Sequence, residues 1–155
     1  MILWRLADPR YARDLAGTGN RMFGARWNSP GRGVVYCAEH LSLAILENLV
    51  HLPPELRASL PPRHAVSIDF PNDVRATTIN RLPRGLRDHN LVAWCRRLGD
   101  QWLDEGNTLL LRAPSVIVPQ EYNVMLNPAH PLMIKVRIAH AKPFSFDGRL
   151  TALSR

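Results

Sequence analysis

Apolar residues along this chain form short runs separated by glycine, proline and charged residues, and the spacing within each run predicts its secondary structure. Compact apolar runs predict strands at residues 2–6, 34–38, 65–70, 108–112, 116–118 and 132–138. Helical spacing predicts a short helix from residue 9 to about residue 15, and longer helices at residues 40–52 and 90–105. Strands and helices therefore interleave along the chain.

The two longer helices have the clearest signals. Leu91, Cys95, Leu98 and Trp102 fall on one face of the helix predicted at residues 90–105. The helix at residues 40–52 is expected to end before Pro53-Pro54, because proline has no N–H and its ring clashes with the preceding turn.

The remaining segments are rich in turn residues. Residues 17–33 contain many glycines, asparagines and prolines, so we expect an ordered irregular loop there. We expect residues 72–87 to be irregular, and residues 143–155 to pack on the domain or to help assemble an oligomer. Because the elements interleave without regular βαβ spacing, we predict an α+β fold in a single domain over residues 1–155.

The composition fits one folded domain. A chain of 155 residues with 46% hydrophobic residues can bury a real core. No apolar run approaches the ~18 residues of a membrane span, and no signal peptide is recognisable, so we expect a cytoplasmic protein without a membrane partner. Cys37 and Cys95 lie far apart, and the six histidines have no metal-binding spacing. We therefore expect reduced, buried cysteines and no metal.

The net charge of +7 comes almost wholly from arginine, since Lys135 and Lys142 are the only lysines. A high pI is typical of nucleic-acid-binding proteins, but here the arginines are scattered from Arg5 to Arg155. Scattered guanidinium groups suit an anionic small molecule or an acidic partner protein at least as well. Two non-catalytic alternatives stay open: a basic nucleic-acid-binding domain, whose affinity would fall steeply with salt, and an interaction subunit with a degenerate cleft.

Three residues with chemical potential follow one another in the first third of the chain. Arg26 lies on a glycine-bounded turn, Tyr36 in a short strand and Glu47 on a helix. A guanidinium can grip phosphate, an aromatic ring can stack on nicotinamide, and a carboxylate can stabilise developing positive charge. The ordinary alternatives are a surface arginine, a core tyrosine and a solvated polar stripe made of His40, Glu47 and His51.

The common nucleotide-binding motifs are absent. Gly17-Thr18-Gly19 lacks the third glycine of a dinucleotide-binding fingerprint, and the sequence contains no P-loop. A dinucleotide would therefore bind by another architecture.

A second group of polar residues lies in an apolar segment near the C-terminus. Ser115 stands between a proline and an apolar run, and Asn123 and Asn127 follow. Buried amides need partners, so these residues brace loops or meet a ligand. No GxSxG sequence surrounds Ser115, which argues against a serine-hydrolase nucleophile.

Taken together, these residues resemble the RES-domain family, which is named for its arginine, glutamate and serine. The likeness runs through residues 24–47 (GARWNSPGRGVVYCAEHLSLAILE), where Arg26, Tyr36 and Glu47 take the family's arginine, tyrosine and glutamate positions. It resumes at residues 114–131 (PSVIVPQEYNVMLNPAHP), where Ser115 takes the serine position. Members of the family are toxins of bacterial RES–Xre toxin–antitoxin pairs.

The resemblance implies an ADP-ribosyltransferase-like fold, with a split mixed β-sheet and flanking helices around an NAD cleft. It also implies a toxin that consumes NAD by hydrolysis or phosphorolysis of the nicotinamide–ribose bond and so arrests growth. A cognate antitoxin with an Xre-like helix-turn-helix would hold the toxin inactive in a hetero-oligomer, and the toxin itself would not bind nucleic acid directly.

The resemblance also implies a role for each site residue, with NAD as the substrate and no metal. Arg26 would hold the phosphate and ribose side of NAD, and Tyr36 would stack on nicotinamide. Glu47 would stabilise the positive charge that develops on the ribose, while Ser115 and Asn123 would orient the ligand.

The acceptor is left open by the sequence. ADP-ribosylation of a host-cell protein is the alternative to water or phosphate as acceptor. Gln120-Glu121 does not provide the ExE glutamate pair of the better-known transferases, which weakly favours a small acceptor.

Overall fold

A computed structural model of the protein describes residues 1–57, 59–85 and 88–150. These residues contain one mixed sheet with the strand order β4-β5-β6-β2-β1-β3-β7. The strands are β1 (Ile2–Ala7), β2 (Val35–Ala38), β3 (Arg63–Asp69), β4 (Ala76–Thr78), β5 (Leu110–Pro114), β6 (Tyr122–Leu126) and β7 (Arg137–Phe144). The β4–β5 pair is parallel and the other pairs are antiparallel. The α+β prediction is therefore confirmed.

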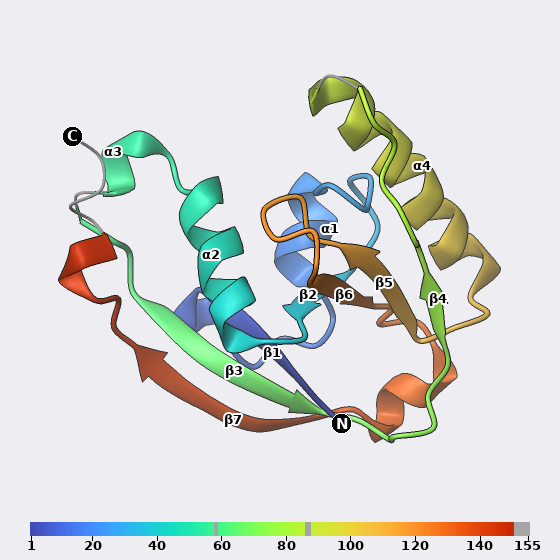
Figure 1. The fold of residues 1–155 in the computed structure, drawn as a ribbon. Helices are drawn as coiled ribbons and strands as arrows, with labels where there is room; N and C mark the ends of the chain where they lie inside the picture. The colour runs from blue at the N-terminus through green and yellow to red at the C-terminus, as the bar shows by residue number, and fades with distance from the viewer. Residues whose placement is uncertain (58, 86–87, 151–155) are drawn as a thin grey trace.

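The sheet is split between β1 and β2. These two strands are in register at Trp4 and Ala38 alone, whereas β1 pairs with β3 along its whole length. The two halves consequently diverge, and α2 (Leu41–His51) lies over the half that contains β1 and β3 (Figure 1). This is the split sheet that the resemblance implies.

The α-helices of the described residues flank the sheet. They are α1 (Thr18–Phe23), α2, α3 (Pro54–Arg57) and α4 (Asp88–Glu105), and short 3-10 helices cover Pro9–Tyr11, Pro131–Lys135 and Gly148–Leu150. The helix α2 ends just before Pro53-Pro54, as predicted. The helix α4 runs along the half of the sheet that contains β4 and β5 (Figure 1).

The core consists mainly of two apolar clusters. One joins both halves of the sheet through residues such as Leu3, Ile68 and Leu126. The other packs α4 against β5 and β6 through Cys95, Trp102, Leu111 and Met125, which confirms the apolar face predicted for this helix. Both cysteines are free and buried, as predicted.

The predicted loop at residues 17–33 contains the helix α1, so that prediction is wrong. Glycine and asparagine disfavour a helix here, but tertiary packing overrides their propensity. Gly17 adopts φ +65°, and a Cβ added at this position would lie 2.5 Å from the Val34 backbone nitrogen. The side chain of Asn20 then ties the helix to the Val34 carbonyl.

The strand predicted at residues 116–118 is also absent from the structure. The Ser115 hydroxyl accepts hydrogen bonds from the backbone N–H groups of Ile117 and Val118, both 3.0 Å long. These N–H groups are therefore used in a side-chain-stabilised turn and are not available for a sheet ladder.

Other boundaries differ as well. The strand predicted at residues 132–138 is a 3-10 helix followed by β7, the helix after Asp8 stops at Tyr11, and residues 72–87 contain β4. The strand β6 was not predicted at all. At the C-terminus, β7 and a 3-10 helix are described as far as Leu150, so residues 151–155 of the predicted closing segment, like residues 86–87, lie outside the described residues.

Candidate active site

Glu47 is the centre of a small hydrogen-bond network between α2 and the other half of the sheet. Its Oε1 accepts one bond from the Ser115 hydroxyl (2.8 Å) and another from the Asn123 side-chain amide (2.5 Å). Its Oε2 accepts no hydrogen bond from the residues that the structure describes. One carboxylate oxygen is thus fixed in place, and the other can meet a ligand.

Ser115 is held rigidly at the end of β5. It is 1% exposed, and its backbone N–H donates to the Glu121 carbonyl. Because its hydroxyl proton points to Glu47 while its oxygen accepts two backbone N–H groups, the whole capacity of this hydroxyl is used. In this geometry the Ser115 hydroxyl contacts Glu47 and is not among the groups that line the neighbouring pocket.

A pocket of about 410 Å³ lies beside this network. Four of the five site residues predicted from the sequence line it, namely Arg26, Tyr36, Glu47 and Asn123. They come from a loop, β2, α2 and β6, so elements far apart in the sequence form one pocket. Ser115, the fifth, does not line the pocket but is hydrogen-bonded to Glu47, which does.

Tyr36 borders the pocket with its hydroxyl already engaged. The hydroxyl donates to Oδ1 of Asn28 (2.8 Å) and accepts from the backbone N–H of Trp27 (2.9 Å). Burial raises the pKa of this hydroxyl far above its ordinary value of 10.0, so it stays protonated. The aromatic ring is therefore the part of Tyr36 that can contact a ligand.

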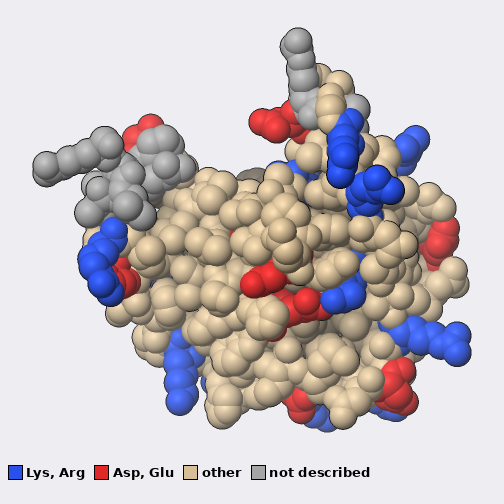
Figure 2. Space-filling view, in the orientation of Figure 1, with Lys and Arg blue, Asp and Glu red and all other residues tan. Residues whose placement is uncertain are grey.

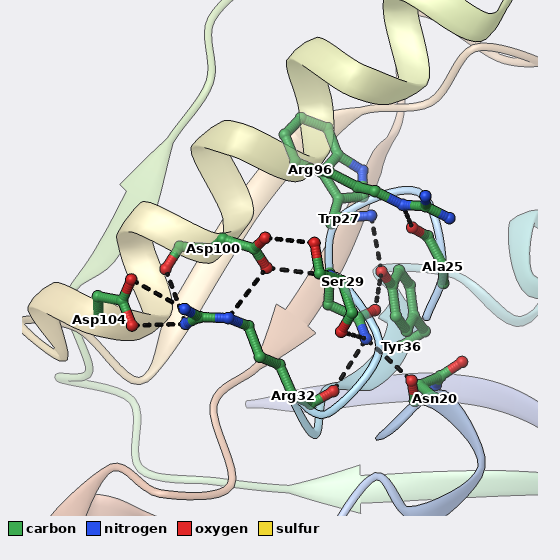
Figure 3. Close-up of polar contacts among 10 residues, drawn as sticks. Asn20, Ala25, Trp27, Ser29, Arg32, Tyr36, Arg96, Asp100 and Asp104 are labelled. Atoms are coloured by element: carbon green, nitrogen blue, oxygen red, sulfur yellow. Dashed lines mark hydrogen bonds and ion pairs between the residues drawn. The ribbon is translucent and has the colours of Figure 1, made fainter. Parts of the chain in front are cut away.

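The turn that contains Arg26 is fastened to α4 on both sides, through Ala25 and through Ser29 (Figure 3). On one side of it, the Arg96 side chain donates a 2.8 Å hydrogen bond to the Ala25 carbonyl. On the other side, the Ser29 backbone N–H and hydroxyl both donate to the Asp100 carboxylate. Arg26 is half-buried and lines the pocket, and its guanidinium makes no hydrogen bond or ion pair with the described residues. The turn therefore brings an uncommitted cation to the pocket.

Sequence reasoning missed several residues of the pocket. Trp4, Arg5 and Asn48 also line it. Of these three, only Arg5 stands out in the sequence, because it is a charged residue inside an apolar strand. Its guanidinium donates hydrogen bonds to the carbonyls of Tyr11 and Asp14. The buried Asn28 that holds Tyr36 gave no recognisable signal, because asparagine is common in turns.

The polar stripe predicted on α2 divides in the structure. Glu47 and His51 line the pocket. His40 precedes the helix, and its Nδ1 lies 3.4 Å from Oε2 of Glu121. Asn127 is 3% exposed and accepts a bond from the Ala129 N–H, so it braces a turn.

Charge is dispersed over the face shown in Figure 2, where blue and red side chains are interspersed and do not form one continuous basic patch. Within residues 1–57, 59–85 and 88–150, no three His, Cys, Asp or Glu side chains are grouped to hold a metal ion. Among the helices described, none has the length and apolar character needed to cross a membrane.

The fold has a solved counterpart in a toxin–antitoxin complex. The crystal structure of the M. tuberculosis MbcT–MbcA toxin–antitoxin complex contains a chain that superposes with a TM-score of 0.70 at 15% identity. The alignment covers 99% of the present chain and 86% of that chain. At this identity the likeness shows a shared fold.

Sequence comparison defines the family. Residues 2–147 match the RES domain, and the chain therefore belongs to the RES domain family. The Prs ADP-ribosylating toxin of Sphingobium sp. (strain YBL2) is 37% identical, with 95% of this chain and 94% of that protein covered. A Toxin Res of Photorhabdus laumondii is 35% identical, with 97% of both chains covered. A Toxin Res of Pseudomonas putida is 36% identical, with 97% of this chain and 99% of that protein covered.

Proposed function

We propose that this protein is the toxin of a toxin–antitoxin pair, and that it consumes NAD by cleaving the nicotinamide–ribose bond, which arrests growth. We also propose that residues 1–155 form a single RES domain. Family membership and the names of the relatives support the toxin assignment. The observation that carries the chemistry is the Glu47 carboxylate, fixed through Oε1 and facing the same pocket as Arg26 and Tyr36.

The reaction begins with loss of nicotinamide. The bond between the ribose C1 and the pyridinium nitrogen breaks, and both electrons go to the nitrogen, so nicotinamide leaves as a neutral molecule. No strong general acid is needed for this departure, which agrees with a Tyr36 hydroxyl that is committed to Asn28. Positive charge then grows on the ribose, where Oε2 of Glu47 stabilises it directly or through a ribose hydroxyl.

The other residues bind and orient. Arg26 takes the phosphate and ribose side of NAD, since its guanidinium has no partner among the described residues and suits phosphate oxygens. The Tyr36 ring stacks on nicotinamide. Asn123 touches both Glu47 and the pocket, and Ser115 acts through Glu47. No step calls for a metal.

The acceptor completes the reaction in one of two ways. Water attacks C1, loses a proton and yields ADP-ribose, or phosphate attacks through an oxygen and yields a phosphorylated ADP-ribose. A second candidate is transfer to a protein side chain, which the name of the Sphingobium relative favours. A cognate antitoxin with an Xre-like helix-turn-helix would keep the toxin inactive in a hetero-oligomer.

The test is NAD consumption by the purified protein with and without phosphate, with products separated by chromatography. Nicotinamide with ADP-ribose identifies hydrolysis, and a phosphorylated ADP-ribose formed only with phosphate identifies phosphorolysis. Labelled NAD incubated with a lysate reports transfer to a protein. Survival of NAD with and without phosphate, together with no labelled protein in the lysate, would overturn the proposal. The nucleic-acid-binding alternative would then lead, and a salt titration of DNA and RNA binding would test it.

A further inference from the structure

Asn28 is the most heavily used polar side chain of the loop that carries Arg26. It is 0% exposed, and its side-chain nitrogen lies within hydrogen-bond distance of three backbone carbonyls, those of Asn20 (3.0 Å), Ser29 (3.3 Å) and Arg32 (2.9 Å). Its Oδ1 accepts the proton of the Tyr36 hydroxyl (2.8 Å). One buried amide therefore connects α1, the turn and β2.

The same residue closes the turn around Arg26. The backbone carbonyl of Asn28 accepts a 2.9 Å bond from the Ala25 N–H, so the two residues that flank Arg26-Trp27 are joined. The Trp27 N–H in turn donates to the Tyr36 hydroxyl. Every bond from Asn28 thus constrains either the loop backbone that presents Arg26 or the hydroxyl that orients Tyr36.

We propose that Asn28 is a positioning residue, which fixes the Tyr36 ring and the Arg26 turn in the geometry that binds NAD. The proposal rests on the proposed function, since it concerns the same pocket. Asn28 does not itself line the pocket. It acts through two residues that contact substrate in the ground state, so its loss weakens substrate binding more than it slows the chemical step.

Removal of the amide cannot be compensated locally. A serine at this position would be too short to reach three carbonyls, which lie on separate segments of the loop. The Tyr36 hydroxyl would then lose its acceptor and the ring could rotate. A displacement of about 1 Å of a substrate-contacting group is enough to cost up to about a hundredfold in activity.

The experiment compares Asn28→Ser, Tyr36→Phe and the double variant with the wild type. Asn127→Ser is the matched control, because Asn127 is another buried asparagine that braces a turn but does not line the pocket. Three quantities are measured: kcat for NAD, KM for NAD, and the hydrogen-exchange rate of the Trp27 amide, which needs no turnover.

We expect Asn28→Ser to raise KM for NAD by about tenfold or more, with a smaller change in kcat, and to speed exchange of the Trp27 amide. Tyr36→Phe should also raise KM for NAD and speed exchange of the Trp27 amide. The KM of the double variant should not exceed that of the more affected single variant. Asn127→Ser should leave KM for NAD and the exchange rate of the Trp27 amide at wild-type values, even where it lowers stability.

A wild-type KM in folded Asn28→Ser, or effects that multiply in the double variant, would overturn the proposal. If Asn28→Ser does not fold, the KM of Tyr36→Phe decides the question, because this variant removes the donor of the bond to Asn28. Exchange of the Trp27 amide does not count for that variant, since Trp27 loses its own acceptor. If the wild type neither binds nor consumes NAD, the proposed function fails. Exchange of the Trp27 amide then still decides whether Asn28 fixes the tyrosine hydroxyl, and an unchanged rate would refute it.

Discussion

The Ser115 hydroxyl donates a 2.8 Å hydrogen bond to Glu47 Oε1 across a sequence separation of 68 residues. The bond joins the end of β5 to the middle of α2 and therefore connects the two halves of the split sheet. It also fixes the carboxylate that the proposed reaction uses. A serine that does not line the pocket thus holds a carboxylate that does.

Replacement of Ser115 by alanine should therefore lower turnover with little change in substrate binding. We expect kcat for NAD to fall by about tenfold, because Glu47 loses one of its two donors and can move away from the ribose. KM should stay within about twofold of the wild type, since the serine does not line the pocket. Steady-state kinetics of Ser115→Ala measures both.

Ser67→Ala is the control for that variant. Ser67 is 2% exposed, and its hydroxyl has no hydrogen-bond partner in the described residues. Its removal should leave kcat unchanged and stability equal or slightly higher, because an unsatisfied buried hydroxyl is lost. An unchanged kcat in Ser115→Ala would mean that the serine has no part in positioning Glu47.

Contact between α4 and the Arg26 turn depends on Gly99. A Cβ added there would lie 1.9 Å from the Trp27 carbonyl oxygen. Gly99→Ala should lower the free energy of unfolding by about 1–3 kcal/mol, because the clash with backbone outweighs the gain of about 1 kcal/mol in helix propensity. Urea denaturation followed by circular dichroism measures this change.

A second helical glycine serves as a reference for Gly99. A Cβ at Gly19 in α1 would meet its nearest atom, in the Tyr11 ring, at 3.8 Å, an ordinary contact distance. Gly19→Ala should therefore be neutral or slightly stabilising. Equal stability of the two alanine variants would contradict the close packing of α4 on the turn.

Cys37 should make the fold sensitive to alkaline pH. Burial raises the pKa of its thiol from 9.0 to about 12. The raised pKa means that the folded state keeps a proton that the unfolded state loses above pH 9, so the contribution to stability is complete below pH 9 and declines as pH rises towards 12. Between pH 8 and pH 10 this loss is roughly 1 kcal/mol.

The comparison that isolates this effect is wild type against Cys37→Ala, with the free energy of unfolding measured at several pH values. Other groups titrate in both proteins and cancel in the difference. The variant should have lower stability at neutral pH from lost packing, but a shallower decline above pH 9. Parallel pH profiles would show that the thiol is not held protonated by burial.

The sequence predicted the elements whose signals are local. Helix α4 has an apolar face that repeats with helical spacing, and this face contains the buried residues Cys95 and Trp102. Helix α2 was bounded by Pro53-Pro54. The short strand β2 was a compact apolar run between a glycine-rich loop and a polar helix start. In these cases propensity, pattern and tertiary packing agree.

The secondary-structure predictions fail where contacts between residues far apart in the sequence, or side-chain hydrogen bonds, determine the backbone conformation. Helix α1 contradicts its glycine and asparagine content and forms because Gly17 packs on Val34. The apolar run at residues 116–118 is a turn because the Ser115 hydroxyl takes its N–H groups. Strand β6 is paired on both sides, with β2 and β5, and pairing of that range cannot be read from local composition.

The candidate site shows the same contrast between what local residue chemistry predicts and what distant contacts determine. Residue chemistry singled out Arg26, Tyr36, Glu47 and Asn123, and the structure brings all four to one pocket. The sequence could not show which residues support the pocket without lining it. Ser115 is hydrogen-bonded to Glu47 in this way, and Asn28 to Tyr36. Supporting contacts of this kind join residues that no spacing rule connects.

The most direct test of the account is NAD turnover by wild-type protein and by Glu47→Gln at equal concentration. The amide keeps the size of the side chain but removes the negative charge that is expected to stabilise the ribose cation. We predict a loss of turnover of about 10²-fold or more with the fold unchanged by circular dichroism. Wild-type rates of NAD loss in folded Glu47→Gln would contradict the assignment of this pocket as the catalytic site.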